Sequence, residues 1–174
     1  MEKIILIGYM GCGKTTIGSA LSKVMNLDFI DLDRYIELKQ HMEITDIFDE
    51  KGQQYFRELE TECLKEILDK NCGFILSTGG GSPCYAQNMN LMNKNGVTIY
   101  LKMEAKSLYY RLKSQKSKRP VIANLADDVL EKYIEAHLKE REIFYKKSQI
   151  IIDIENEKLY RDLTQGRLLK DYQV

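Results

Sequence analysis

Lys3-Ile-Ile-Leu-Ile7 runs directly into Gly8-Tyr-Met-Gly-Cys-Gly-Lys-Thr15, and this stretch decides the fold of the chain. The apolar run has the length of a buried strand, and residues 16–23 after it have the pattern of a helix. The fixed positions of G-x-x-x-x-G-K-S/T, the phosphate-binding P-loop, are filled by Gly8, Gly13, Lys14 and Thr15. An ordinary glycine turn would rarely combine this spacing with a strand before it and a helix after it. We therefore interpret the stretch as a P-loop.

Each part of this motif suits the binding of phosphate. Glycines allow backbone N–H groups to turn toward phosphate oxygens, and the N-terminus of the following helix adds the positive end of its dipole. Lys14 is placed to reach the β- and γ-phosphates, and the Thr15 hydroxyl is placed to hold Mg²⁺. We predict that the chain binds a nucleoside triphosphate through Gly11, Cys12, Gly13, Lys14, Thr15 and Thr16.

The composition indicates one globular domain without a charged surface for large partners. The chain has 174 residues, 44% of them hydrophobic, with 26 basic and 26 acidic side chains. Balanced charge gives no reason to expect nucleic acid or membrane as a partner, and no apolar run reaches the length of a membrane span. The first strand starts by Lys3, which leaves no room for a signal peptide. The four cysteines lack framework or metal-site spacing, so we expect a reducing, cytoplasmic location.

Strands and helices alternate along the rest of the chain. Further strands are expected at 27–33, 74–77, 97–101 and 150–154, and helices within 34–51 (two short ones) and at 53–70, 85–94, 104–113, 126–147 and 157–169. This alternation predicts a three-layer α/β domain, in which helices cover both faces of a five-stranded parallel sheet. Ligands of such sheets bind beyond the carboxyl ends of the strands. The P-loop, Asp31 with Asp33, and Gly79–Gly81 all fall there.

Asp31 and Asp33 are candidates for the chemistry beside the P-loop. If the chain stays extended, their side chains lie on one face of the second strand. One carboxylate could hold a water on Mg²⁺, and the other could accept a hydrogen bond from an acceptor hydroxyl and act as its base. The alternative for Asp33 is a structural role as the N-cap of a helix that begins at Arg34.

Arg57 and Arg141 lie on helical stripes that otherwise face the core. A buried guanidinium needs a partner, either a protein carboxylate or the carboxylate of a ligand, and the spacing leaves both alternatives open. Glu60 lies three residues after Arg57 and could form a structural pair with it. His137 shares the stripe of Arg141 and is expected to be a core histidine, whereas His41 is expected at the surface.

Two loops complete the set of candidate residues. Gly79-Gly-Gly81 permits another group to approach the backbone very closely, although three glycines could also form a simple flexible loop. The polar, basic stretch 114–120 carries no apolar anchor, so it is expected to be either a solvated surface loop or a mobile lid. As a lid, at about 112–122, it would bring Arg119, stiffened by Pro120, over the γ-phosphate.

The ordered set of these motifs resembles the shikimate kinase family, in the nucleoside monophosphate kinase-like group of P-loop proteins. The resemblance runs from Lys3 to about Asp153. It rests on Gly8-x-x-Gly11-x-Gly13-Lys14-Thr15, Asp31-x-Asp33, Gly52-x-x-x-Phe56-Arg57-x-x-Glu60, Gly79-Gly80-Gly81, Arg119-Pro120 and Arg141-x-x-x-Tyr145. It implies a single P-loop kinase domain over 1–174, with an acceptor-binding helical segment at about 33–60. It further implies transfer of the ATP γ-phosphoryl group to the 3-hydroxyl of shikimate, giving shikimate 3-phosphate and ADP on the route through chorismate to aromatic amino acids.

The resemblance also implies roles for individual residues. Shikimate would be held by Asp33, Arg57, Gly79, Gly80, Gly81 and Arg141, with the two arginines clamping its carboxylate. Asp33 would orient the reacting hydroxyl, and Lys14 and Arg119 would stabilise the transferring phosphoryl group. Mg²⁺ would be held by Thr15 and, through water, by Asp31, and Arg111 would lie near adenine. The expected partners are shikimate and ATP alone, bound by a monomer.

The chain departs from the family pattern at three positions. The family usually has Gly where His41 stands, Glu at Gln53 and Pro at Ile143. The first two fall in the acceptor-side segment and are expected to affect its loop conformation and affinity. None of the three removes a group assigned to the chemistry.

Other P-loop functions were weighed against this one. A gluconate kinase or a nucleoside monophosphate kinase would use another acceptor, but paired arginines favour a small carboxylic acid. A switch GTPase should carry N-K-x-D, and Asn93-Lys-Asn-Gly96 lacks the aspartate. An ATPase motor should end its third strand in an acid, where this chain has Ser77-Thr78. The small-molecule kinase is the favoured interpretation.

Overall fold

The strands of the central sheet all run parallel. The computed structural model describes residues 2–114, 122 and 125–170 of the chain. Within this part, five strands lie in the order β2-β3-β1-β4-β5. Their bounds are Lys3–Ile7 for β1, Asp28–Asp31 for β2, Phe74–Ser77 for β3, Val97–Lys102 for β4 and Ile150–Asp153 for β5. The predicted five-stranded parallel sheet is confirmed.

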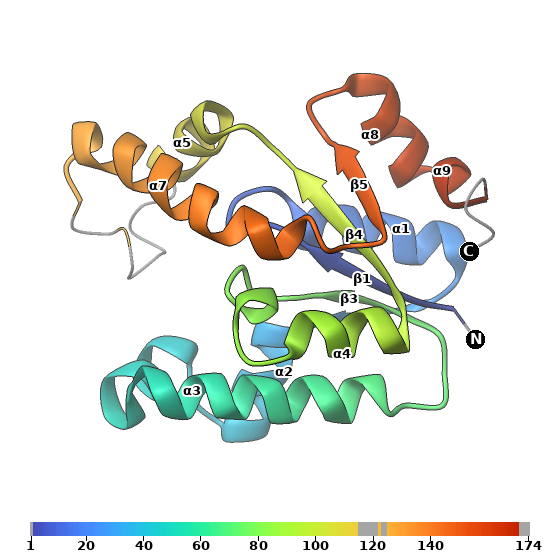
Figure 1. Cartoon of the computed structure of the whole chain (residues 1–174). Coiled ribbons are helices and arrows are strands. Elements are labelled where there is room, and N and C mark those ends of the chain that lie inside the picture. Colours follow the sequence, from blue (N-terminus) through green and yellow to red (C-terminus); the bar gives the residue numbers. More distant parts are fainter. Residues whose placement is uncertain (1, 115–121, 123–124, 171–174) are drawn as a thin grey trace.

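Helices cover both faces of this sheet (Figure 1). Helices α1 and α8 pack together on one face, and α3, α4 and α7 lie on the other. The bounds are Lys14–Met25 for α1, Leu32–Gln40 for α2, Ile44–Leu68 for α3, Ser82–Cys84 for the 3₁₀ helix η1, Asn88–Asn95 for α4, Ala105–Lys113 for α5, Asp127–Tyr145 for α7, Glu157–Thr164 for α8 and Arg167–Lys170 for α9. The predicted three-layer architecture is therefore confirmed. No helix in the described ranges is both long and apolar enough to cross a membrane.

Strand β1 lies at the centre of the sheet because its side chains are apolar on both faces. Ile4 to Ile7 are fully buried, and Ile5 pairs with Leu76 of β3 on one side and with Thr98 of β4 on the other. Strands covered by helices on both faces are expected to be continuously apolar in this way. The chain leaves β1 toward the face of α1 and leaves β3 toward the face of α4 (Figure 1). Two neighbouring strands whose connections diverge open a crevice at their carboxyl ends, where ligands bind in such folds.

The second strand ends earlier than the sequence pattern predicted. Strand β2 stops at Asp31, and α2 begins at Leu32, so Asp33 lies in the first turn of a helix rather than on the face of a strand. The N-cap is Asp31, whose Oδ1 accepts a hydrogen bond from the backbone N–H of Arg34 at 3.4 Å. The predictions of a shared strand face and of an N-cap role for Asp33 are therefore wrong. A carboxylate at the N-cap accepts a hydrogen bond from the backbone N–H three residues later and so favours the start of a helix. In this chain that carboxylate belongs to Asp31.

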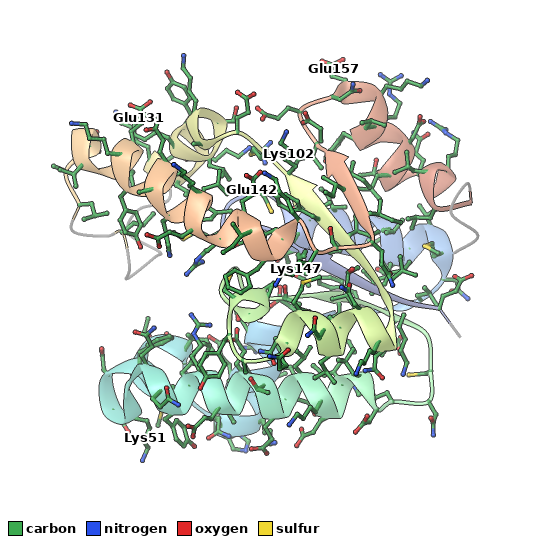
Figure 2. The ribbon with its side chains drawn as sticks, viewed as in Figure 1. Lys51, Lys102, Glu131, Glu142, Lys147 and Glu157 are labelled. Atoms are coloured by element: carbon green, nitrogen blue, oxygen red, sulfur yellow. The ribbon has the colours of Figure 1, made fainter. Side chains whose placement is uncertain are left out.

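The segment after α2 contains two sharp changes of backbone direction. His41 is the C-cap of α2, with a positive φ of 53°. Glycine adopts this left-handed conformation without the steric cost of about 1 kcal/mol that a side chain brings, which explains the glycine that the resemblance expects here. Helix α3 bends at Gly52, whose φ is 82°, and Figure 2 shows the preceding Lys51 pointing outward at this bend. His41 is exposed, as predicted, and so is Gln53.

Candidate active site

A cavity of about 510 Å³ opens at the carboxyl ends of β1, β2 and β3. It brings together segments that are far apart in the sequence: the P-loop, the end of β2, the glycine turn after β3 and the last turn of α5. Its lining residues are Met10, Gly11, Gly13, Lys14, Thr15, Thr16, Asp31, Asp33, Ser77, Thr78, Gly79, Gly80 and Arg111. Residues predicted for the donor and acceptor halves of a two-substrate site therefore share one cavity, although Cys12, Arg57, Gly81 and Arg141 do not line it.

The P-loop ends at a glycine with a left-handed backbone conformation. Gly13 is the N-cap of α1 with a φ of 99°, a value that residues with a side chain rarely adopt. Helix α1 therefore begins at Lys14, two residues before the predicted start, and Lys14, Thr15 and Thr16 of its first turn line the cavity. Lys14 is only 8% exposed, and its ammonium donates to the carbonyls of Gly8 at 2.9 Å and Tyr9 at 3.0 Å. A buried cation is thus held over the centre of the loop by its own backbone.

Thr15 and Asp31 meet at the edge of the cavity. The Thr15 hydroxyl donates to Asp31 Oδ2 at 2.9 Å, while Asp31 Oδ1 caps α2. Mg²⁺ in nucleotide sites is commonly held by one or two carboxylates together with water and phosphate oxygens. A hydroxyl and a carboxylate at this separation beside the P-loop fit such an ion.

Asp33 extends from the first turn of α2 into the cavity. Its pKa is raised to about 6 because protein surrounds the carboxylate and because Asp31 and Glu60 add negative charge, while Lys14 acts in the opposite direction. The side chain still has solvent access, since it lines the open cavity. A carboxyl group with this pKa is placed to take up a proton near neutral pH.

The glycine turn after β3 leaves room for these carboxylates. A Cβ added to Gly79 would lie 2.9 Å from Glu60 Oε1 and 3.0 Å from Asp33 Oδ1. An added side chain would force Glu60 to shift and would crowd Asp33, so the two acids approach the backbone of the turn closely. The close approach seen at Gly79 is to the protein's own side chains, and an approach of the turn to a ligand stays a prediction.

Arg57 and Glu60 form the structural pair that was one of the alternatives. Arg57 Nη1 lies 2.6 Å from Glu60 Oε2, and the Glu60 side chain is only 1% exposed. The Ser82 hydroxyl donates to Glu60 Oε1, so this carboxylate is held at both oxygens. The Arg57 guanidinium packs against Gly81, where an added Cβ would lie 2.5 Å from Nη2. Arg57 is therefore fixed at the edge of the glycine turn.

Arg141 lies on the other side of the same turn. Its guanidinium is near Gly80, where an added Cβ would lie 3.4 Å from Nη1, and it lies over the ring of Tyr9 at 5.8 Å from the centroid. Tyr145, one helical turn further along α7, donates its hydroxyl to the carbonyl of Gly80 at 2.6 Å. Across the described ranges, Arg141 forms no ion pair with a carboxylate. A ligand as the partner of this arginine stays a prediction.

Arg111 connects the main cavity with a second one of about 410 Å³. The other walls of the second cavity come from the end of β5 and from α8, at Ile154, Glu155, Glu157, Tyr160, Arg161 and Thr164. The sequence provided no motif in this part of the chain. Arg111 also donates to the carbonyl of Gly11 at 3.4 Å, which places it beside the P-loop.

The structure describes only part of the predicted lid, and it adds residues to the cavity wall that were not predicted. Arg119 and Pro120 lie outside the described residues, as does most of the predicted lid, of which the structure describes residues 112–114 and 122. Met10, Ser77 and Thr78 also line the cavity, although no sequence motif predicts a role for them. Their position next to the P-loop and at the end of β3 is the signal that could have identified them.

Comparison with known proteins agrees with this geometry. Residues 10–167 match the family model for shikimate kinase. A curated shikimate kinase of Flavobacterium johnsoniae is 43% identical over 157 residues, which are 90% of this chain and 91% of that protein. The chain belongs to the shikimate kinase family. Members of this family are ATP-dependent kinases that transfer phosphate to shikimate, so the predicted family, enzyme class and reaction are confirmed.

Solved structures of shikimate kinases have the same fold as this chain. The crystal structure of the enzyme from Bacteroides thetaiotaomicron is 38% identical, with a TM-score of 0.89 over 99% of both chains. The shikimate kinase of Acinetobacter baumannii, solved in complex with shikimate, is 30% identical with a TM-score of 0.86, over 99% of this chain and 94% of that one. The similarity therefore extends over the whole kinase domain and not only over the P-loop.

Proposed function

We propose that ATP and shikimate bind next to each other in the 510 Å³ cavity. We further propose that the residues predicted from the sequence have their predicted roles there. One observation carries the proposal: Lys14 of the donor loop and Asp33 of the acceptor side line the same cavity. Their charges are close enough for Lys14 to affect the pKa of Asp33. The γ-phosphoryl group of ATP bound beside Lys14 and the hydroxyl of shikimate bound beside Asp33 would therefore lie next to each other, as direct transfer requires.

The acceptor half is formed by the glycine turn and the two arginines. Gly79, Gly80 and Gly81 allow a small ligand to approach the backbone, with Arg57 at one end of the turn and Arg141 at the other. A planar carboxylate accepts paired N–H bonds from a guanidinium, so these arginines suit the carboxylate of shikimate. Glu60 holds one Nη of Arg57, which leaves the other guanidinium N–H groups for the ligand.

The proposed chemistry is a direct displacement. The oxygen of the shikimate 3-hydroxyl attacks the γ-phosphorus, the bond from that phosphorus to the bridging oxygen breaks, and ADP leaves with this oxygen. Asp33 orients the hydroxyl and takes up its proton. Lys14 neutralises the negative charge that spreads over the transferring group. Arg119 is proposed to assist Lys14 from the lid, a role that stays a prediction because this residue lies outside the described ranges.

The donor half is formed by the P-loop and the second cavity. Backbone and side-chain groups of residues 11–16 would hold the phosphates, and Arg111, which lines both cavities, would lie against the adenine. The 410 Å³ cavity beside Arg111 has a suitable place for the nucleoside. Thr15 and Asp31 would hold Mg²⁺, Asp31 through water, and the ion would supply positive charge that offsets the negative charge of the phosphates.

The wider organisation is part of the same proposal. We infer a single kinase domain over 1–174 with an acceptor-binding segment at about 33–60 and a lid at about 112–122. The chain is proposed to act as a cytoplasmic monomer. Four cysteines without framework spacing support the location, and all four are free thiols in the structure.

The decisive experiment measures ADP release with shikimate, gluconate and nucleoside monophosphates in turn. Rapid release is expected with shikimate alone, and mass spectrometry should identify the product as shikimate 3-phosphate. Release with shikimate that does not exceed the rate without any acceptor would overturn the proposal. Release with gluconate or a nucleotide instead would reassign the acceptor half of the cavity.

A further inference from the structure

The P-loop makes a direct side-chain contact with the helix that carries Arg141. The hydroxyl of Tyr9 lies 2.9 Å from Nδ1 of His137, a hydrogen bond between residues 128 positions apart. The two rings meet edge to face, with centroids 5.6 Å apart and an interplanar angle of 85°. Tyr9 occupies a variable position of the P-loop motif, and no role in phosphate binding follows from its side chain.

His137 belongs to a row of side chains along α7. Tyr133, His137, Arg141 and Tyr145 are each four residues apart, so they lie on one face of the helix, one above the other. His137 also packs against Tyr133, with ring centroids 5.0 Å apart. The Tyr9 ring, 1% exposed, contacts two members of this row: its hydroxyl bonds His137, and its face lies against the guanidinium of Arg141.

We propose that Tyr9 and His137 are positioning residues that orient Arg141 toward the acceptor carboxylate and so connect the donor loop to the acceptor half of the site. The proposal rests on the role of Arg141 proposed above. The Tyr9 ring supports the guanidinium by a cation–π contact. The bond to His137 prevents this ring from turning away, because it fixes the far end of the ring to the helix one turn before Arg141.

The protonation states of both partners suit this bond at neutral pH. Burial and the nearby charge of Arg141 lower the pKa of His137 to about 4, so its ring is neutral. Burial, and to a lesser extent Tyr133, raises the pKa of Tyr9, so the phenol keeps its proton. The phenol therefore donates and Nδ1 accepts, which leaves the ring proton of His137 on Nε2.

The energetic test compares ligand affinities of single variants by calorimetry. Tyr9→Phe removes the hydroxyl but keeps the ring, and it should weaken shikimate binding about five-fold, the usual loss for one hydrogen bond, while ATP binding changes less than two-fold. His137→Phe should have the same effect, and His137→Asn should restore affinity because its Oδ1 can replace Nδ1 as acceptor. The double variant Tyr9→Phe/His137→Phe should be no worse than either single one, since both remove one bond.

Thr98→Val is the matched control, because it removes a buried hydroxyl that bonds Asn93 near the amino end of β4, and Thr98 lines neither cavity. It should leave both affinities unchanged. The positioning role is overturned if Tyr9→Phe and His137→Phe bind shikimate as the unaltered chain does. It is equally overturned if they lose affinity for ATP and shikimate to the same extent, because the effect would then be a general disturbance of the P-loop.

A second measurement tests the bond without any ligand. His41 and His137 are the only histidines of the chain, so long-range ¹H–¹⁵N spectra contain just two imidazole patterns. His137 should show the Nε2–H tautomer, and Tyr9→Phe should change that pattern and leave that of His41 as it is. The opposite tautomer in the unaltered chain would contradict the bond.

Arg141→Ala separates this inference from the proposed function. If Arg141→Ala leaves shikimate affinity unchanged, the acceptor role of Arg141 is wrong. If Arg141→Ala weakens binding strongly and the Tyr9 and His137 variants do not, the acceptor role stands and only the positioning role fails.

Discussion

Thr15 Oγ1 donates a hydrogen bond to Asp31 Oδ2 across 2.9 Å, which joins the start of α1 to the end of β2. The second oxygen of Asp31 accepts from the backbone of Arg34 and so begins α2, the helix that carries Asp33. One carboxylate therefore belongs both to the proposed metal site and to the element that delivers the proposed base. The two roles can be separated by mutation because each uses a different oxygen.

Asp31→Asn should weaken the binding of Mg²⁺ without disturbing the fold. The amide oxygen can still cap α2, but the negative charge that favours the ion is lost. We expect the Mg²⁺ concentration for half-maximal activity to rise at least about ten-fold, with a melting temperature within about 2 °C. Asp31→Ala, the control, should show the same metal defect and also lose roughly 1 kcal/mol of stability with the cap. An unchanged magnesium titration for both variants would remove Asp31 from the metal site.

Lys14→Met should abolish transfer and leave the protein folded. The ammonium is nearly buried and bonds groups of the loop itself, namely the carbonyls of Gly8 and Tyr9 and the sulfur of Cys12, and methionine fills a similar volume without charge. Loss of a preorganised charge at the reacting centre costs at least about a hundred-fold in rate. Single-turnover assays should show this loss, and circular dichroism should be unchanged. A variant that keeps more than a tenth of its activity would contradict the role of Lys14.

Much of the architecture follows from local sequence, and the reason is physical. The P-loop and the apolar runs at 4–7 and 74–76 are determined by neighbouring residues, so the sheet and the donor half of the site were predictable. The position of Asp33 was not, because the competition between a strand and a capped helix is decided by which aspartate reaches the N–H of Arg34. A periodicity of two residues cannot resolve that choice.

Long-range contacts mark the limit of the sequence argument. The spacing on α7 placed His137 and Arg141 on one stripe, but it contained no information about Tyr9, which lies 128 positions away. The same holds for α8, whose residues reach the second cavity only because β5 pairs with β4 and turns the chain back toward Arg111. Both features depend on tertiary packing that no local pattern encodes.

Arg57→Ala and Arg141→Ala should differ in stability although both weaken shikimate binding. Arg57 neutralises the buried Glu60, and removal of one partner of a buried pair typically costs about 3 kcal/mol. Arg141 has no carboxylate partner in the described part of the chain, so its removal should cost far less stability. Denaturant unfolding should therefore separate the two variants, and calorimetry should give ATP affinities close to normal for both. Equal stabilities would show that Glu60 does not depend on Arg57.

Arg57→Ala/Glu60→Gln provides the control for this comparison. Neutralising Glu60 should recover most of the stability lost in Arg57→Ala, because the unpaired buried charge is gone. Shikimate affinity should stay low, since the arginine is still missing. If affinity returned together with stability, the effect of Arg57 on binding would be purely structural.

Gly81→Ala should disturb the acceptor half alone. The added methyl group would lie 2.5 to 2.8 Å from the Arg57 guanidinium, which must move away. We expect a rise in the KM for shikimate of about ten-fold or more, with the KM for ATP nearly unchanged. Gly73→Ala, at the amino end of β3 where an added Cβ would lie 2.9 Å from the carbonyl oxygen of Glu2, is a control for the general cost of an added methyl at a crowded glycine. A similar KM for shikimate in Gly81→Ala and the unaltered chain would show that Arg57 can move at no cost to binding.

The pH dependence of the reaction should report Asp33. Because its pKa is raised to about 6, kcat/KM for shikimate should fall about ten-fold per pH unit below that value, as the base becomes protonated. Asp33→Asn should lose at least about a hundred-fold in rate and should no longer show this acid limb. A profile that is flat between pH 5 and 8 in the unaltered chain would exclude Asp33 as the base.

The protonation of Asp33 should also affect the free energy of unfolding, and in the opposite direction: its contribution to stability should decrease as the pH rises. Folded Asp33 keeps its proton to about pH 6, whereas the unfolded residue loses it near 3.8, so the contribution of Asp33 to the unfolding free energy falls as pH rises between these values. His137 acts oppositely, because its folded pKa of about 4 lies below the unfolded 6.5, and its contribution rises with pH over that window. Asp33→Asn should therefore make stability increase more steeply from pH 4 to 6, and His137→Phe should make it increase less. Chemical unfolding at pH 4, 5 and 6 measures both slopes, and a variant whose curve runs parallel to that of the unaltered chain would show that the pKa shift of the replaced residue is absent.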